Sequence, residues 1–217
     1  MRILLTIFLI LFLCSCTNFN SSNIAPGYKD AFISVTNYFI GIEDNLTPDL
    51  INEIPYASAV LKIGRGPRGL IILESIESSR YNWVSADGII ITTNQYGKII
   101  STEGLINNLK YIESSYEDFR DLDLKAEYTS YYTYSLPTLN LLPINTAFNI
   151  YEEERVDLLR GSKNLTQIDE IIYSPILGWK SVNSYWIDEE GFGWKSKQYI
   201  SPKLPPFYLE ITKKPAI

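Results

Sequence analysis

Short β-rich runs separated by tight turns dominate the chain between residues 57 and 102. The runs lie at 57–63, 70–76, 81–85, 89–93 and 98–102. Asp87-Gly88 lies between two apolar runs and is the strongest short-range signal for a β-hairpin. Links this short cannot hold the long crossover that joins parallel strands, so the runs predict an antiparallel meander.

Strand-like runs continue through the second half of the chain. They lie at 126–134, 144–151, 154–160, 168–174, 179–187, 192–200 and 207–212. The sequence contains no internal repeat and no linker to a second domain. Residues 28–217 are therefore predicted to form a single mainly β domain, an antiparallel β-barrel or sandwich with one or two short N-terminal helices.

The expected helices are few and short. Residues 28–41 place apolar side chains at helical spacing. Thr47 is a favourable N-cap, Pro48 is a favourable first helical residue, and Pro55 ends this second helix. Between the two groups of strands, only a short helix around residues 116–122 is expected.

The chain has no histidine, and its two cysteines are Cys14 and Cys16. The missing histidine excludes Ser-His-Asp and Cys-His triads and histidine-ligated zinc. The cysteine positions leave the folded part without a disulfide or a thiol nucleophile, and no cofactor or metal is expected. A formal net charge of −6 argues against a nucleic-acid partner, which needs a basic footprint.

Residues 1–15 are predicted to be a lipoprotein signal peptide. Arg2 supplies positive charge before an apolar run from Ile3 to Leu13. At about 1.5 Å per residue, this run spans only about half of a ~30 Å hydrocarbon core. The run is too short for a membrane-spanning helix and has the length of a signal h-region.

The cleavage site resembles a bacterial lipobox, Leu13-Cys14-Ser15-Cys16. Ser15 is the small residue required before the lipidated cysteine, so Cys16 is the predicted lipidation site; an ordinary secretory signal is the alternative. Several acyl chains would make the anchor effectively permanent. Residues 16–27 are predicted to form a lipidated flexible tether. Thr17 stands where an aspartate would favour retention in the inner membrane, so we expect the outer membrane, on its periplasmic face.

Two basic motifs resemble binding or catalytic patterns. Gly64-Arg65-Gly66-Pro67-Arg68-Gly69 matches G-x-G-x-x-G, but a strand-like run follows it where a dinucleotide site needs a helix. The motif is therefore predicted to be a hairpin turn, with Arg65 and Arg68 available to an acidic partner. Lys195-Ser196-Lys197 contains the residue types of a Ser-Lys dyad. Neighbours on a strand face apart, so this segment is interpreted as structural.

Acidic clusters occur at Glu152–Glu154, Asp169–Glu170 and Asp188–Glu190. A glycosidase needs two carboxylates held about 5–10 Å apart across a cleft. Adjacent acids on a strand point to opposite faces and acids in turns are solvated, so structural roles are the simpler interpretation.

Aromatic side chains leave two interpretations open. Four tryptophans and 16 tyrosines either pack in a β core or form platforms on which sugar rings stack. The tryptophans are Trp83, Trp179, Trp186 and Trp194, and tyrosines gather at positions 128, 131, 132 and 134. Core packing is the simpler interpretation, with saccharide contact expected only from rings that remain exposed.

A series of short motifs runs through the chain in a fixed order. They are Tyr56-Ala57-Ser58, Gly64-x-Gly66-Pro67, Trp83-x-Ser85-Ala86-Asp87-Gly88, Gly97-Lys98-Ile99-Ile100-x-Thr102-x-Gly104-Leu105, Tyr185-Trp186-Ile187-Asp188, Gly191, Trp194-x-Ser196-x-Gln198 and Pro202. With the lipobox, this series resembles the YjbF/GfcB lipoproteins over most of residues 45–212. Lys98 departs from it, because an arginine is expected there.

The resemblance implies a largely β fold and a lipoprotein encoded with exopolysaccharide or capsule secretion genes. It implies no enzymatic activity, and Cys16 is the one functional residue it transfers. We therefore expect a non-catalytic outer-membrane lipoprotein in exopolysaccharide or capsule export or assembly. Its partners would be the membrane through the lipid anchor, an outer-membrane barrel or polysaccharide export complex, and the polysaccharide itself. The alternatives are a lipid or acyl carrier with an apolar β cavity, and a polysaccharide-modifying enzyme with paired carboxylates.

Overall fold

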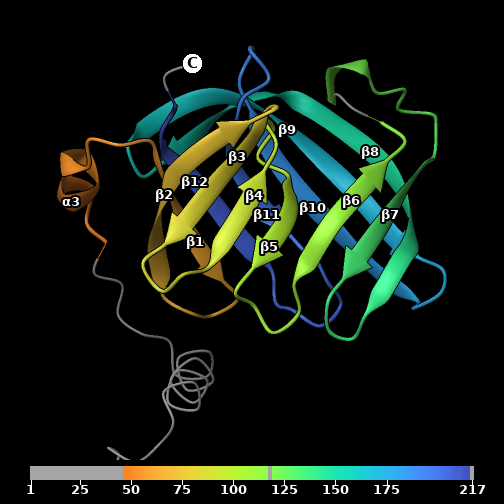
Figure 1. Cartoon of the computed structure of the whole chain (residues 1–217). Coiled ribbons are helices and arrows are strands. Elements are labelled where there is room, and N and C mark those ends of the chain that lie inside the picture. The colour runs from red at the N-terminus through yellow and green to blue at the C-terminus, as the bar shows by residue number, and fades with distance from the viewer. Residues whose placement is uncertain (1–45, 117–118, 216–217) are drawn as a thin grey trace, which may run out of the picture.

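The computed structural model describes residues 46–116 and 119–215. Within them, twelve strands form one antiparallel sheet rolled into a nearly closed barrel (Figure 1). The strands are β1 (Ser58–Ile63), β2 (Arg68–Glu77), β3 (Arg80–Ser85), β4 (Ile90–Thr93), β5 (Ile99–Glu103), β6 (Leu109–Ser114), β7 (Tyr128–Tyr134), β8 (Leu139–Leu158), β9 (Gly161–Ser174), β10 (Trp179–Ile187), β11 (Gly193–Gln198) and β12 (Phe207–Lys213). The prediction of a mainly β, antiparallel fold is confirmed.

The strands follow one another around the barrel in chain order. The sheet runs β5-β4-β3-β2-β1-β12-β11-β10-β9-β8-β7-β6, so β1 pairs with both β2 and β12. This is the predicted meander, closed by pairing of the first and last strands. The sheet edges are β5 and β6, which leaves a seam between two consecutive strands.

Side chains tie the seam together near the short loop between β5 and β6. The backbone N–H of Leu109 donates to Thr102 Oγ1 at 3.0 Å, and the N–H of Leu105 donates to Asn108 Oδ1 at 2.9 Å. These bonds satisfy backbone donors that the missing ladder would otherwise leave unpaired.

The barrel interior is packed with side chains. Alternate residues point inward, as the period of two in a strand requires. The largest cluster contains Trp83, Tyr132, Tyr134, Phe207 and many aliphatic residues, all buried. A carrier would need an apolar cavity here, and this packing counts against that alternative.

The turn between β4 and β5 reaches β11 on another wall of the barrel. The Gly193 N–H donates to Gln95 O at 2.9 Å, and Gln198 Nε2 donates to Gly97 O at 2.7 Å. A Cβ on Gly193 would lie 2.2 Å from the Tyr96 carbonyl oxygen. Only glycine permits so close an approach of two backbones.

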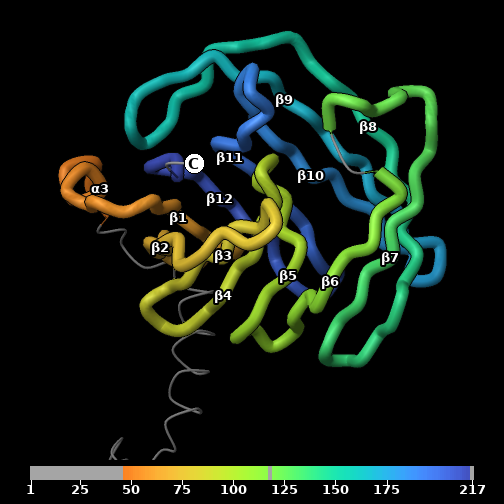
Figure 2. Tube along the Cα trace, turned by 45° about the horizontal axis from the view of Figure 1, so that its top comes forward, coloured from red at the N-terminus to blue at the C-terminus, as the bar shows by residue number. Residues whose placement is uncertain are grey.

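A long hairpin of β8 and β9 extends past the barrel wall. The separate runs predicted at 144–151 and 154–160 belong to one strand, β8, with a register shift between Ile150 and Glu153. Figure 2 shows the tip of this hairpin beside β12. There Arg160 Nη1 donates to the Thr212 carbonyl oxygen at 3.1 Å, so the tip lies against the outside of the wall.

The helical predictions had mixed outcomes. Helix α3 (Pro48–Glu53) begins as predicted, with Thr47 Oγ1 accepting the Leu50 N–H at 3.3 Å. In place of the helix expected at 116–122, the structure describes a 3₁₀ turn, η2 (Phe119–Asp121). Strand β6 was not predicted at all. The helix predicted at 28–41 lies outside the described residues.

Candidate functional site

A buried carboxylate, Glu170 on β9, is the centre of a polar cluster inside the barrel. Its Oε1 accepts from Lys98 Nζ at 2.6 Å and from the Tyr116 hydroxyl at 2.6 Å. Its Oε2 accepts from the Tyr185 hydroxyl at 2.7 Å and Asn183 Nδ2 at 3.0 Å. The donors come from the end of the β4–β5 turn, the segment after β6, and β10. The cluster therefore joins several parts of the barrel.

The charges of this cluster are set by its surroundings. Burial alone raises the pKa of Glu170, but attraction to Lys98 and the hydrogen bonds from Lys98, Tyr116 and Asn183 outweigh burial and hold that pKa below its usual range. Burial and the nearby carboxylate raise the pKa of both Tyr116 and Tyr185. Glu170 is thus an ionised acceptor surrounded by donors, an arrangement for holding structure together rather than for transferring a proton.

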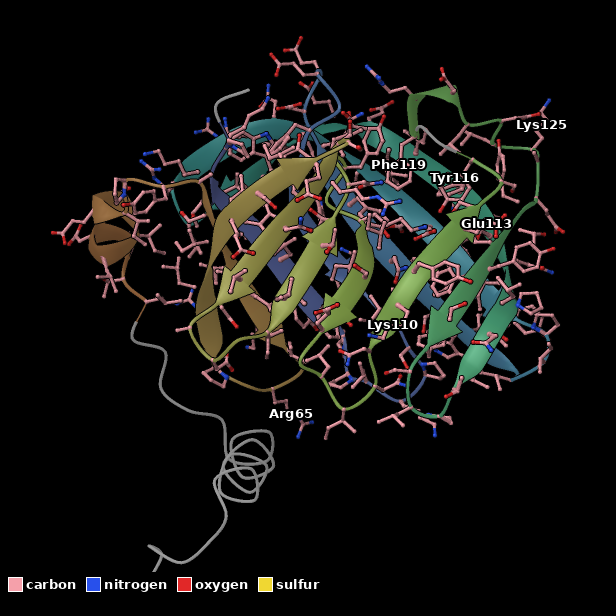
Figure 3. All side chains as sticks on the ribbon, in the orientation of Figure 1. Arg65, Lys110, Glu113, Tyr116, Phe119 and Lys125 are labelled. Carbon is pink, nitrogen blue, oxygen red and sulfur yellow. The ribbon has the colours of Figure 1, made fainter. Side chains whose placement is uncertain are left out.

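A polar cavity of about 370 Å³ opens at the β5–β6 seam beside this cluster. It is lined by Arg80, Asn94, Lys98, Ile100, Tyr111, Ile112, Ser114 and Tyr116. The Lys98 ammonium lies 4.8 Å from the centre of the Tyr116 ring. Figure 3 shows Tyr116 and Phe119 at one end of the barrel and Arg65 at the other. Lys98 lines this cavity, and its ion pair with Glu170 neutralises its charge.

A second cavity, of about 320 Å³, lies on the outside of the barrel over β2, β1, β12, β11 and β10; we call it the outer groove. It is lined by Val60, Lys62, Arg68, Leu159, Trp186, Lys195, Ser196, Lys197, Tyr208, Leu209 and Glu210. Leu159, at the hairpin tip, covers one side. The volume falls within the range of about 300–1,000 Å³ typical of small-molecule sites. Four cations and two aromatic rings thus share one concave surface.

Glu210 is the one carboxylate among the residues that line the outer groove. Burial raises its pKa, and the Leu159 N–H, Lys195 and Arg68 reduce that shift. A lone acid cannot supply the pair of carboxylates that hydrolysis of a glycosidic bond requires. The groove therefore has the composition of a binding surface and lacks that catalytic arrangement.

The predicted acidic clusters have structural roles where the structure shows their contacts. Asp169 and Glu170 face opposite sides of β9, as expected, with only Glu170 buried. Asp188 orders the β10–β11 turn by accepting from the Phe192 N–H and from Trp194 Nε1, both at 2.8 Å. Residues 152–154 are exposed on the long hairpin.

The structure places the residues of each basic motif in different surroundings. Ser196 faces inward, where its Oγ accepts from Gln198 Nε2 at 2.8 Å, while Lys195 and Lys197 line the outer groove. The prediction that Ser196 and the two lysines face opposite sides of the strand is confirmed, but the sequence analysis did not identify the surface that Lys195 and Lys197 share. Arg68 lines the same groove, whereas Arg65 is exposed in the turn.

Most of the aromatic residues that the structure describes pack in the interior, in agreement with the simpler interpretation. Trp83 is buried and donates to Thr93 Oγ1 at 3.0 Å. Trp179 and Trp194 pack against the largest cluster, and Tyr132 and Tyr134 belong to it. The aromatic residues in the outer groove are Trp186 and Tyr208.

No cluster of three or more acidic, cysteine or histidine side chains suited to a metal ion occurs in the part of the chain that the structure describes. Among those same residues, no helix is long and apolar enough to cross a bilayer. The predicted lipidation site Cys16 lies outside them.

The family model described as "Group 4 capsule polysaccharide lipoprotein gfcB, YjbF" matches residues 30–213. The chain belongs to the YjbF family. The YjbF family match extends from before helix α3 to the end of β12 and so includes the whole described barrel, the interior cluster and the outer groove.

Two proteins of Escherichia coli (strain K12) are relatives within the YjbF family. The uncharacterized lipoprotein YjbF is 24% identical over 173 residues, which cover 77% of this chain and 80% of that protein. The uncharacterized lipoprotein GfcB is 24% identical over 239 aligned positions, which cover 98% and 99%. The crystal structure of the hypothetical lipoprotein YmcC from E. coli has a TM-score of 0.69 at 17% identity and covers 90% of this chain and 100% of its own. The fold of this YjbF-family chain is therefore shared with that lipoprotein.

Proposed function

We propose that this chain is a non-catalytic lipoprotein, anchored through Cys16 to the periplasmic face of the outer membrane, which takes part in the export or assembly of a capsule or exopolysaccharide. Membership of a family described as capsule polysaccharide lipoproteins carries this proposal. The lipobox supports the anchor, and a concave outer surface with cations and aromatic rings supports a role based on contact.

The geometry favours binding over chemistry. The most buried carboxylate, Glu170, is fully engaged by donors, and the carboxylate of the outer groove has no acidic neighbour in the groove lining. The barrel works as a rigid scaffold that presents its outer wall to a polymer or to an export complex. A tether of the length of residues 16–27 leaves that wall free to reach a partner near the membrane.

Deletion of the gene tests the proposal. We expect a strain that lacks the chain to secrete less surface polysaccharide, and a plasmid copy of the full-length chain to restore secretion. Transcript levels of the neighbouring genes are the control for polar effects. Unchanged polysaccharide in the growth medium and on the cell surface, with normal neighbouring transcripts, would overturn the proposal.

A further inference from the structure

We propose that the outer groove binds a stretch of acidic polysaccharide, with carboxylate-bearing sugar residues seated on Tyr208 and Trp186. This inference rests on the proposed function and names the ligand class. It is carried by the order in which five neighbouring strands, from β2 to β10, place their outward side chains.

The first row of the groove crosses β2, β1, β12 and β11. Pairing of the strands sets Arg68 opposite Lys62, Lys62 opposite Tyr208, and Tyr208 opposite Lys197. Neighbouring strands lie about 4.8 Å apart. Lys62 and Lys197 therefore lie one strand away on either side of the Tyr208 ring. A sugar ring stacked on this tyrosine would place its carboxylate within reach of a cation on either side.

The second row lies two residues further along the strands. It runs from Val60 to Glu210, Lys195 and Trp186, again by direct strand pairing. Two residues of a strand span roughly 7 Å. The groove thus presents two aromatic positions, each with a lysine beside it, to successive parts of an extended chain.

The charge of the groove opposes the charge of the whole chain. The chain has a formal net charge of −6, yet this surface has four cations and one carboxylate. Among the described residues, Lys62, Lys195 and Lys197 form no ion pair with an acidic side chain. The Glu210 carboxylate already accepts the Leu159 N–H. Lys195 Nζ donates to the Asp157 carbonyl oxygen at 3.5 Å, and its charge also acts on Glu210. Lys62 and Lys197 are therefore the lysines most available to an external anion.

The shape of the surface favours a polymer over a membrane. Leu159 at the hairpin tip lines one side of the groove, and Val60 adds an apolar side chain to its lining. A flat lipid surface fits a concave groove poorly, whereas a single extended chain can lie along it. Aromatic rings beside cations also suit sugar residues, which combine an apolar ring face with charged substituents.

Binding of oligogalacturonate and oligoalginate to the full-length lipidated protein in detergent micelles tests this inference. We expect both acidic chains to bind, more weakly as salt rises, and the fully methyl-esterified oligogalacturonate to bind at least severalfold less. The double variant Lys62→Gln with Lys197→Gln should weaken binding roughly tenfold, because two charge contacts are lost. Lys110→Gln, on exposed β6 (Figure 3), should leave affinity unchanged. Tyr208→Ala should also weaken binding.

A fallback variant and three contrary results complete the test of this binding inference. If the double variant unfolds, two other variants replace it. The charge-preserving variant Lys62→Arg with Lys197→Arg should keep the affinity for the acidic chains, whereas the single variant Lys197→Gln should lose part of that affinity. Equal affinity for the methyl ester, or no binding of either acidic chain, overturns the inference. It also fails if phosphatidylglycerol vesicles bind through these lysines and the acidic chains do not. None of these results bears on whether deletion lowers polysaccharide secretion, so the two proposals fail separately.

Discussion

The ammonium of Lys98 lies 2.6 Å from the carboxylate of Glu170, and both side chains are buried inside the barrel although 72 positions separate them in the chain. Transfer of either charge from water to the interior is costly, and their attraction repays that cost only because further donors satisfy the carboxylate. Loss of one partner would leave the other charge buried without compensation.

Lys98→Met removes the cation and keeps most of the side-chain volume. We expect the free energy of unfolding to fall by about 3–5 kcal/mol, because Glu170 would stay buried without its counter-charge. Urea unfolding followed by tryptophan fluorescence measures this change. Lys110→Met, on the exposed side of β6, is the matched control and should change stability by less than about 0.5 kcal/mol. Equal midpoints for the two variants would mean that the pair has no stabilising role.

The low pKa of Glu170 links stability to acid pH. Its pKa is lower in the folded state than in the unfolded chain, so the stabilisation is present above the ordinary value of 4.5 and is lost as pH falls through the lowered folded value. We expect the free energy of unfolding to decline in that acid range. Glu170→Gln, which cannot titrate, should be less stable near neutrality and should show a shallower decline. Unfolding curves at a series of pH values check this, and parallel declines would contradict it.

Local pattern predicted much of the barrel but could not predict this pair. Alternation along β9 places Asp169 and Glu170 on opposite faces, yet it does not say which of them faces inward. That choice depends on where Lys98 lies, and its position follows from strand pairing across the whole barrel. In the same way, Lys195 and Lys197 share a face by alternation alone, but their approach to Lys62 depends on the pairing of the first and last strands.

Strand β6 shows a different limit of sequence reasoning. Lys110 and Tyr111 are both exposed at a register shift, so alternation begins only at Tyr111, and apart from Leu109 no residue of β6 is fully buried. A strand at the seam has a partner on one side only, so its pattern is weak and its sequence resembles a loop. The N-cap of α3, in contrast, is a local interaction and was predicted from Thr47 and Pro48.

Gly193→Ala tests the contact between the β4–β5 turn and β11. The added Cβ would meet backbone atoms of Tyr96 and Gly97, which cannot rotate away as a side chain would. We expect a loss of roughly 2 kcal/mol or more in unfolding free energy. Gly69→Ala is the control, because its nearest atom would lie 3.9 Å away. Similar urea midpoints for both variants would show that the turn can shift at little cost.

Cys16→Ser tests the predicted lipid anchor, with Cys14→Ser as its matched control. A serine cannot accept the thioether-linked diacylglycerol, so we expect Cys16→Ser to leave the membrane fraction, while Cys14→Ser keeps the wild-type distribution and the mass of the acylated chain. Sucrose-gradient fractionation and intact-mass analysis provide the two measurements. A Cys16→Ser protein that stays with the outer membrane and carries acyl mass would transfer the lipidation site to Cys14. If neither variant changes the fractionation and the wild-type chain has no acyl mass, the lipid anchor does not exist, and the proposed location at the periplasmic face of the outer membrane loses its basis.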